Sequence, residues 1–137
     1  MESLIRNANQ IKQVIDFTKV QNGKIHPSDI DAVLEFNNEA LILIEVKRNN
    51  CWIPTGQRLV LERIVDSWHT HKAIVLHVVH SFKEDNKNIP LHLCKVKQYY
   101  FNKEWQEDKD KTSLIKCLNG LGKSWEIEKL RFEDLSD

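Results

Sequence analysis

The stretch that decides the fold is residues 40–49, which read ALILIEVKRN. A run of apolar residues leads directly into Glu45, Val46 and Lys47, as expected for a buried strand that ends in an acid and a base. Side chains alternate along a strand, so Glu45 and Lys47 share one face while Val46 points to the other. Burying either charge is costly unless a partner or a ligand compensates it. The pair therefore calls for an explanation beyond strand packing.

A second strand is expected immediately upstream, over residues 29–36, which read DIDAVLEF. Apolar and polar residues alternate there, which is typical of a strand with one face on the core. The polar residues 37–39 then form a hairpin loop into the strand of residues 40–47. Asp29 and Asp31 lie on the same face of the strand at 29–36. The hairpin is therefore expected to bring them close to Glu45 and Lys47 on the next strand.

The rest of the chain predicts an α/β domain. We expect a helix at about 3–14, then a short strand at about 16–21 that turns at Asn22-Gly23; the alternative is a longer helix that stops at Gly23. After the central strand we expect a helix at about 56–70, strands at 73–79 and 91–101, a loop at 104–111 and a short helix from about 114. Thr55 would cap the helix at 56–70, and its inward-facing residues would be Leu59, Val60, Ile64 and Trp68.

These elements fit one domain over residues 1–137, with a core at about 3–101 and a helical extension at about 111–137. A strand that follows a helix in this way suggests a crossover, so we predict a mixed sheet of four to five strands with helices on both sides. The helix from about 114 is expected to end near Gly120 or Gly122.

Composition limits the function classes. Lysine plus arginine and aspartate plus glutamate number 20 each, so the net charge is zero and strong non-specific binding to polyanions is not indicated. A local basic face remains compatible with this balance, and Arg48, Arg58 and Arg63 lie close to Glu45 in sequence as candidate phosphate contacts. No apolar run approaches the about 18 residues of a membrane span. The absence of a signal-like start and of paired cysteines predicts a cytoplasmic protein with reduced thiols.

The sequence context distinguishes Glu45-Val46-Lys47 from other triplets of the same kind. The chain contains three acid-x-Lys triplets, and the other two, Asp85-Asn86-Lys87 and Glu107-Asp108-Lys109, lie in polar stretches and are expected at the surface. Only the first ends a buried strand beside a strand that carries aspartate. Its alternative interpretation is an ordinary salt-bridged strand end.

The residues gathered there suit the hydrolysis of a phosphodiester by a metal-dependent enzyme. Asp31 and Glu45 offer the oxygen ligands that Mg²⁺ prefers, and the backbone carbonyl of Val46 can add a third. Asp29 can substitute for Asp31 or help to hold a second metal ion, although a turn role is equally expected for it. Lys47 would orient or deprotonate the attacking water and stabilise developing negative charge.

In these residues the chain resembles the PD-(D/E)XK nuclease superfamily, whose members include restriction enzymes, junction resolvases and many small phage nucleases. The matching pieces are a helix, a hairpin, Asp31 with Asp29, the strand that ends in Glu45 and Lys47, and then a helix and a strand. The resemblance covers roughly two thirds of the chain. It implies a restriction-endonuclease-like core, Asp31 and Glu45 as metal ligands, and Lys47 as the catalytic lysine.

The resemblance also implies a role for Gln57, since several such nucleases carry a glutamine on the helix after this strand; a capping or surface role near the helix N-terminus is equally expected for it. Two features depart from the family pattern. Many members have a glutamate on the first helix, whereas here only Glu2 is available. Pro27 is separated from both aspartates, so it identifies neither of them as the motif residue.

We therefore predict a nuclease that hydrolyses DNA and uses Mg²⁺, with Mn²⁺ as a substitute. Because a short chain offers a small binding face, we expect a homodimer or a substrate defined by its structure, such as a branch, a nick or an end. The alternatives are a catalytically inactive nuclease-like domain that binds nucleic acid or a protein, and an interaction module whose charged pair is only structural. Zinc is disfavoured because no cysteine pair completes a site with His69, His71, His77 and His80. Trp52 would either stack on a base or pack on the sheet.

Overall fold

The computed structural model describes residues 15–83 and 88–134, and it confirms the predicted α/β fold. A mixed sheet of five strands has the order β1-β2-β3-β4-β5, in which β2 and β3 are parallel and the other neighbours are antiparallel. The strands are β1 (Ala32–Phe36), β2 (Ala40–Arg48), β3 (Ala73–His80), β4 (Lys95–Phe101) and β5 (Glu104–Glu107). Within these described residues the helices are α2 (Thr55–Asp66) and α3 (Leu114–Ser124), with a short 3-10 turn, η1 (Leu91–Leu93).

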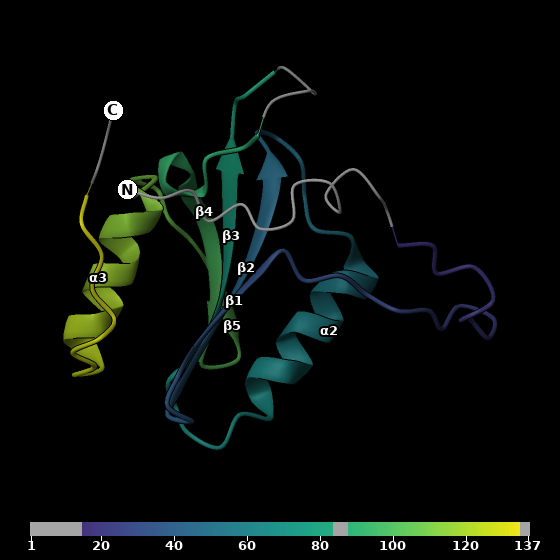
Figure 1. Ribbon diagram of the computed structural model, residues 1–137, viewed down its shortest axis with the longest axis horizontal. Coiled ribbons are helices and arrows are strands. Elements are labelled where there is room, and N and C mark those ends of the chain that lie inside the picture. The colour runs from purple at the N-terminus through teal and green to yellow at the C-terminus, as the bar shows by residue number, and fades with distance from the viewer. Residues whose placement is uncertain (1–14, 84–87, 135–137) are drawn as a thin grey trace.

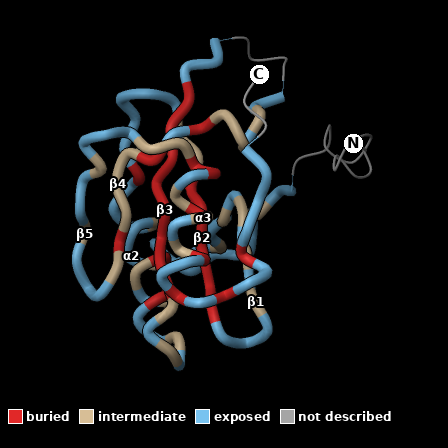
Figure 2. Tube along the Cα trace, turned by 90° about the vertical axis from the view of Figure 1, so that its left-hand side faces the viewer, coloured by how far each residue is buried: buried red, intermediate tan, exposed pale blue. Residues whose placement is uncertain are grey.

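The two helices cover opposite faces of the sheet (Figure 1). One face packs against α3 and the segment after it, and its core includes Ile42, Ile44, Leu76 and Leu130. The other face packs against α2 and includes Leu41, Leu43, Leu61 and Val75. Burial is concentrated in β2 and β3 (Figure 2), and all eight residues of β3 are buried, as expected for a central parallel pair covered on both sides.

The β1–β2 hairpin sets the position of the acidic residues. Its loop contains Asn37 and Asn38, both at positive φ (50° and 59°), a conformation that asparagine tolerates and that tight hairpin turns require. The loop pairs Phe36 with Ala40 and fixes the register along both strands. The predicted alternation in β1 is confirmed, because Ala32, Leu34 and Phe36 are half-buried whereas Val33 and Glu35 are exposed.

The crossover helix α2 differs from the prediction in its phase and its ends. Leu61 and Val65 are its buried residues, whereas Leu59, expected to face the core, is exposed. Several apolar residues give this helix a wide stripe, so the sequence alone leaves its rotation undetermined. Thr55 is the first helical residue rather than the cap, Pro54 takes the capping position, and the helix ends at Asp66 rather than near residue 70.

Other expectations were wrong in detail. Residues 16–21 form turns rather than a strand, and the turn at Gly23 is closed by an isolated bridge between Asn22 and Ile25. Residues 104–107, expected in a loop, form the edge strand β5, and β4 begins only at Lys95. Helix α3 continues past Gly120 and Gly122 to Ser124. The helix predicted at about 3–14 lies outside the described residues. Among those described, no helix combines the length and apolar character needed to cross a membrane.

Candidate metal and phosphate site at the end of β2

The predicted acidic residues converge at the carboxyl end of β2, beside the start of α2. The hairpin register pairs Ala32 with Ile44, so Asp31 lies next to Glu45 at the following position. The Oδ2 atom of Asp31 accepts a hydrogen bond of 2.8 Å from the backbone N–H of Val46, which ties the exposed aspartate to the strand. The structure thus brings Asp31, Glu45 and the Val46 backbone together as the sequence predicts.

Glu45 is the most unusual charged residue of this group, because only 1% of its surface is exposed. Burial, together with hydrogen bonding to the Asp31 carboxyl group and its negative charge, raises the pKa of Glu45 from its ordinary value of 4.5 to about 8. Its Oε2 atom is buried and has no hydrogen-bond partner within residues 15–83 and 88–134. Two carboxyl groups are therefore crowded together with a buried acceptor left unused.

Lys47 and Gln57 approach the same carboxyl group and partly oppose this shift. The Nζ atom of Lys47 lies 4.0 Å from Oε1 of Glu45, at the outer limit of an ion pair. The Gln57 side chain, from the first turn of α2, lowers the pKa of Glu45 by hydrogen bonding and donates through Nε2 to the backbone carbonyl of Asp29 at 3.0 Å. Gln57 thus links the helix to the segment before β1, and its role in catalysis stays a prediction. The exposed Asp29 contributes this carbonyl, and a role for its carboxylate stays a prediction.

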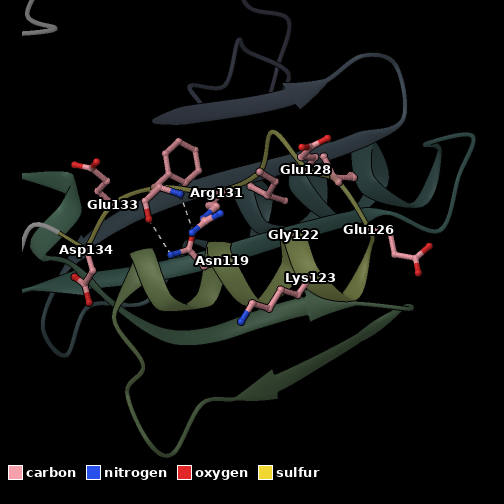
Figure 3. Close-up of a pocket in the computed structure, with 11 residues that line it drawn as sticks. Asn119, Gly122, Lys123, Glu126, Glu128, Arg131, Glu133 and Asp134 are labelled. Carbon is pink, nitrogen blue, oxygen red and sulfur yellow. Dashed lines mark hydrogen bonds between the residues drawn. The ribbon is translucent and has the colours of Figure 1, made fainter.

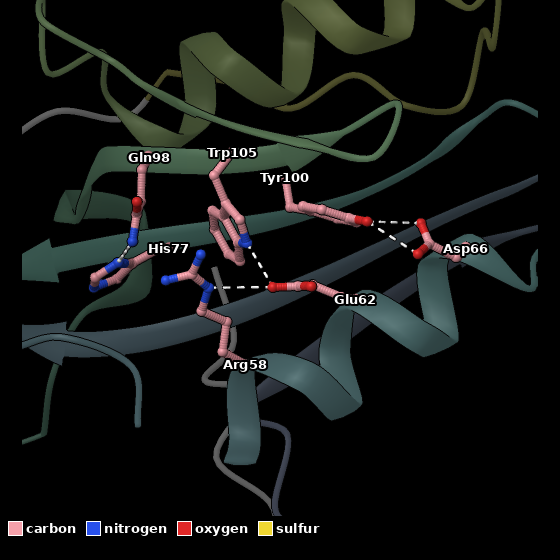
Figure 4. A network of polar contacts seen from close by, with 7 residues as sticks. All are labelled: Arg58, Glu62, Asp66, His77, Gln98, Tyr100 and Trp105. Carbon is pink, nitrogen blue, oxygen red and sulfur yellow. Dashed lines mark hydrogen bonds and ion pairs between the residues drawn. The ribbon is translucent and has the colours of Figure 1, made fainter. Parts of the chain in front are cut away.

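Sequence reasoning missed His77, which lies directly opposite Glu45 in the parallel register of β2 and β3. His77 is fully buried, and its Nδ1 atom lies 2.9 Å from Nε2 of Gln98 on β4 (Figure 4). Burial, and then the nearby ammonium groups of Lys97 and Lys47, lower the pKa of His77 to about 4; the Cys51 backbone acts in the opposite direction. The imidazole is therefore neutral at pH 7. Since Nδ1 accepts from the Gln98 amide, the proton resides on Nε2, which has no hydrogen-bond partner among the described residues.

The position of Lys97 follows from an irregularity of the sheet. Gln98 pairs with His77 and Val96 pairs with Val78, so Lys97 is an extra residue at a β-bulge between these pairs. Its effect on the pKa of His77 places its ammonium group near the site. A sequence motif for this bulge is lacking, because it arises from how two strands pair.

The three predicted phosphate contacts are arranged unequally. Arg48 follows Lys47 at the exposed end of β2. The Arg58 Nε atom pairs with Glu62 at 3.1 Å, and its guanidinium carbon lies 5.2 Å from the centroid of the Trp105 ring (Figure 4). Arg63 occupies the last turn of α2, at the opposite end of the helix from Gln57. Arg48 is therefore next to Lys47 in sequence but on the alternate face of the strand, Arg58 is ordered through its neighbours, and Arg63 is separated from the acidic residues.

A hollow of about 1010 Å³ lies elsewhere, between α3 and the segment that follows it (Figure 3). Its wall includes Asn119, whose side chain makes hydrogen bonds of 2.9 and 2.8 Å with the backbone of Phe132. These bonds fasten the C-terminal segment to the helix. None of the predicted site residues lines this hollow.

The donor set at the end of β2 suits a hard cation. Within the described part of the chain, no group of three or more His, Cys, Asp or Glu side chains is arranged to hold a metal ion. Mg²⁺ keeps several waters and is commonly held by one or two carboxylates, so Asp31, Glu45 and a backbone carbonyl are a sufficient set. The unused Oε2 atom of Glu45 is an available ligand, and a divalent cation would relieve the crowding of the two carboxyl groups.

Comparisons with known proteins add no assignment. The chain matches no protein-family model, no curated protein and no solved structure.

Proposed function

We propose that this protein is a divalent-metal-dependent nuclease that hydrolyses phosphodiester bonds in DNA. One observation carries the proposal: Glu45, buried to 1% exposure, faces the Asp31 carboxyl group, and the Lys47 ammonium lies 4.0 Å from it, at the outer limit of an ion pair. A structural ion pair would be stabilised by a closer contact and by satisfied acceptors. A pair of crowded carboxyl groups with an open acceptor is instead suited to bind a cation.

The arrangement also supports the resemblance of the sequence motif to the PD-(D/E)XK nuclease superfamily. Asp31 and Glu45 would hold Mg²⁺, or Mn²⁺ in its place, together with the Val46 carbonyl. When bound, the metal would neutralise phosphate charge and lower the pKa of a coordinated water. Lys47, on the same face as Glu45, would hold the attacking water by hydrogen bonding and stabilise negative charge that develops on the phosphate. Gln57 would keep the start of α2 in place against the Asp29 carbonyl, and Arg48 would contact the DNA backbone.

A cleavage assay tests the proposal directly. Purified protein is incubated with linear, circular and branched DNA in the presence of Mg²⁺, Mn²⁺ or EDTA. We expect cutting with either metal and none with EDTA. Lys47→Ala and Asp31→Asn should each reduce the rate by about 100-fold or more, the usual contribution of a positioned catalytic group. The matched controls Lys109→Ala and Asp110→Asn change the same residue types in an exposed stretch and should leave the rate unchanged.

The same set of variants separates the alternatives. Cutting that survives in both Lys47→Ala and Asp31→Asn would assign the activity to a contaminant and refute the proposal. Binding of DNA without cutting, with Mn²⁺ affinity absent, would favour a catalytically inactive nuclease-like domain. Binding that falls steeply with salt would point to phosphate contacts, whereas a flat response would favour a protein partner.

A further inference from the structure

Trp52 has an exposed indole beside the candidate site. It lies in the connection between β2 and α2, and 65% of its surface is exposed. The other tryptophans, Trp68, Trp105 and Trp125, are buried or half-buried against the core. A tryptophan exposed to water beside charged side chains is unusual, because its large apolar surface normally packs inside a protein or against a partner.

The indole is positioned by its neighbours rather than left free. Its ring lies edge-on to His77, with centroids 6.5 Å apart and an interplanar angle of 62°. His77 is in turn held by Gln98, and it stands opposite Glu45 in the sheet. The Nζ atom of Lys97 lies over one face of the Trp52 ring, 3.9 Å from its centroid, so a base can stack only on the other face. A rigid aromatic surface and an ammonium group therefore stand one side chain away from the Glu45 carboxyl group.

This combination fits a flat ring attached to an anion, which describes a nucleotide. Stacking on an aromatic side chain accepts any base, while a lysine beside it contacts the phosphate. In duplex DNA both faces of each internal base are covered by its neighbours. Only a base at an end, in a flap or in a single strand offers a free face to Trp52.

We propose that Trp52 and Lys97 form a subsite for an unpaired nucleotide next to the phosphate that is cut. The face of the indole turned away from Lys97 stacks on the base, and the Lys97 ammonium holds the adjoining phosphate. This inference rests on the proposed nuclease function and assigns to it a substrate class, DNA with an unpaired end or a flap.

The test measures binding and cutting separately. Binding is followed by fluorescence anisotropy of labelled oligothymidylate and of a hairpin duplex of equal length, in EDTA, so that no cutting occurs. We expect the intact protein to prefer the unpaired strand, and Trp52→Ala to weaken that binding by roughly 5- to 100-fold while changing duplex binding little. Trp52→Phe should retain most of the affinity, because a ring is kept. Lys97→Ala should lower the salt dependence by about one phosphate contact.

Phe132→Ala provides a matched control, since it removes another partly exposed aromatic ring from the segment after α3. Thermal melts of each variant confirm that it is folded. Equal binding of oligothymidylate by the intact protein and Trp52→Ala would overturn the subsite. If the intact protein cuts DNA in Mg²⁺ but Trp52→Ala shows the same preference for flaps, the subsite fails and the nuclease stands. If the intact protein cuts nothing yet binds unpaired strands through Trp52, the nuclease fails and the subsite stands.

Discussion

Replacing Gly122 by alanine should destabilise the protein by about 3 kcal/mol, because the added methyl group meets backbone atoms. A Cβ atom at this position would lie 2.0 Å from the carbonyl oxygen of Leu130 and 3.1 Å from its carbonyl carbon. A rotamer change cannot relieve the overlap. The segment after α3 would have to move by about 1.4 Å, the difference between 2.0 Å and the shortest ordinary contact of 3.4 Å.

That movement would disturb well-packed groups. The Ile127 N–H donates to the carbonyl of Gly122 at 2.9 Å, and Leu130, Ile127 and Trp125 are all buried in the core beneath α3. Overpacking typically costs about 1–3 kcal/mol, and partial exposure of a buried leucine adds to it. The higher helix propensity of alanine offsets about 1 kcal/mol. The net loss of about 3 kcal/mol corresponds to a fall in Tm of about 10 °C for a domain of this size.

Gly120→Ala is the matched control, since it makes the same change two residues earlier in the same helix. No described atom lies within 4 Å of a Cβ placed there, so only the propensity gain remains and the variant should be more stable by about 1 kcal/mol. Urea and thermal unfolding of both variants measure the difference. Equal stability of the two would refute the close packing of Gly122 on Leu130. Because α3 covers the face opposite the candidate site, Mn²⁺ binding by the folded variants should match that of the intact protein.

Three further predictions concern the other face of the sheet. Since the folded protein keeps a proton on Glu45 that the unfolded chain releases, the metal-free protein should lose stability as pH rises from about 4.5 to about 8. Glu45→Gln should remove this pH dependence, and near pH 8 urea unfolding should show it to be more stable than the unsubstituted protein by at most about 4 kcal/mol. Tyr100→Phe should cost about 1 kcal/mol in the same assay, because its hydroxyl group donates to the Asp66 carboxylate with both oxygens at 2.9 Å, and an unchanged midpoint would contradict this bond. Gln57→Ala removes the hydrogen bond to the Asp29 carbonyl, so it should lower kcat for DNA cleavage even at a temperature at which the variant is fully folded; a lower Tm with an unchanged kcat would make Gln57 merely structural.

The parts of the fold that could be predicted are those in which burial produces a regular pattern of apolar residues in the sequence. The continuous apolar runs of β2 and β3 indicated a central pair, and the alternation in β1 indicated a strand covered on one face. Strand β5 left no such trace, because it is a four-residue edge strand with three exposed residues. It forms through pairing with β4 and through contact of Trp105 with Tyr100, at a centroid distance of 5.4 Å. Those are tertiary causes that a local pattern does not contain.

The candidate site divides in the same way. Asp31 and Glu45 could be placed together because a short hairpin loop sets the register of two consecutive strands. His77 could not be placed, since the register of a parallel pair depends on how the intervening helix packs rather than on a turn. The bulge that adds Lys97 beside Gln98 is likewise a property of the paired strands. The sequence therefore identified the acidic residues of the site and missed His77 and Lys97, which β3 and β4 contribute.

The location of the missed residues bears on whether Glu45 is only structural. A protein under selection for stability alone would gain from replacing Glu45 by an apolar residue, because its carboxyl group is buried, crowded by Asp31 and incompletely hydrogen-bonded. His77 repeats the pattern at the adjacent position, with a buried ring nitrogen that has no hydrogen-bond partner among the described residues. Two neighbouring unsatisfied polar groups concentrate a folding cost at one end of the sheet. Such concentration is expected where a protein gives up stability for a ligand or a reaction, and Lys47, Gln57 and Lys97 are arranged around that point.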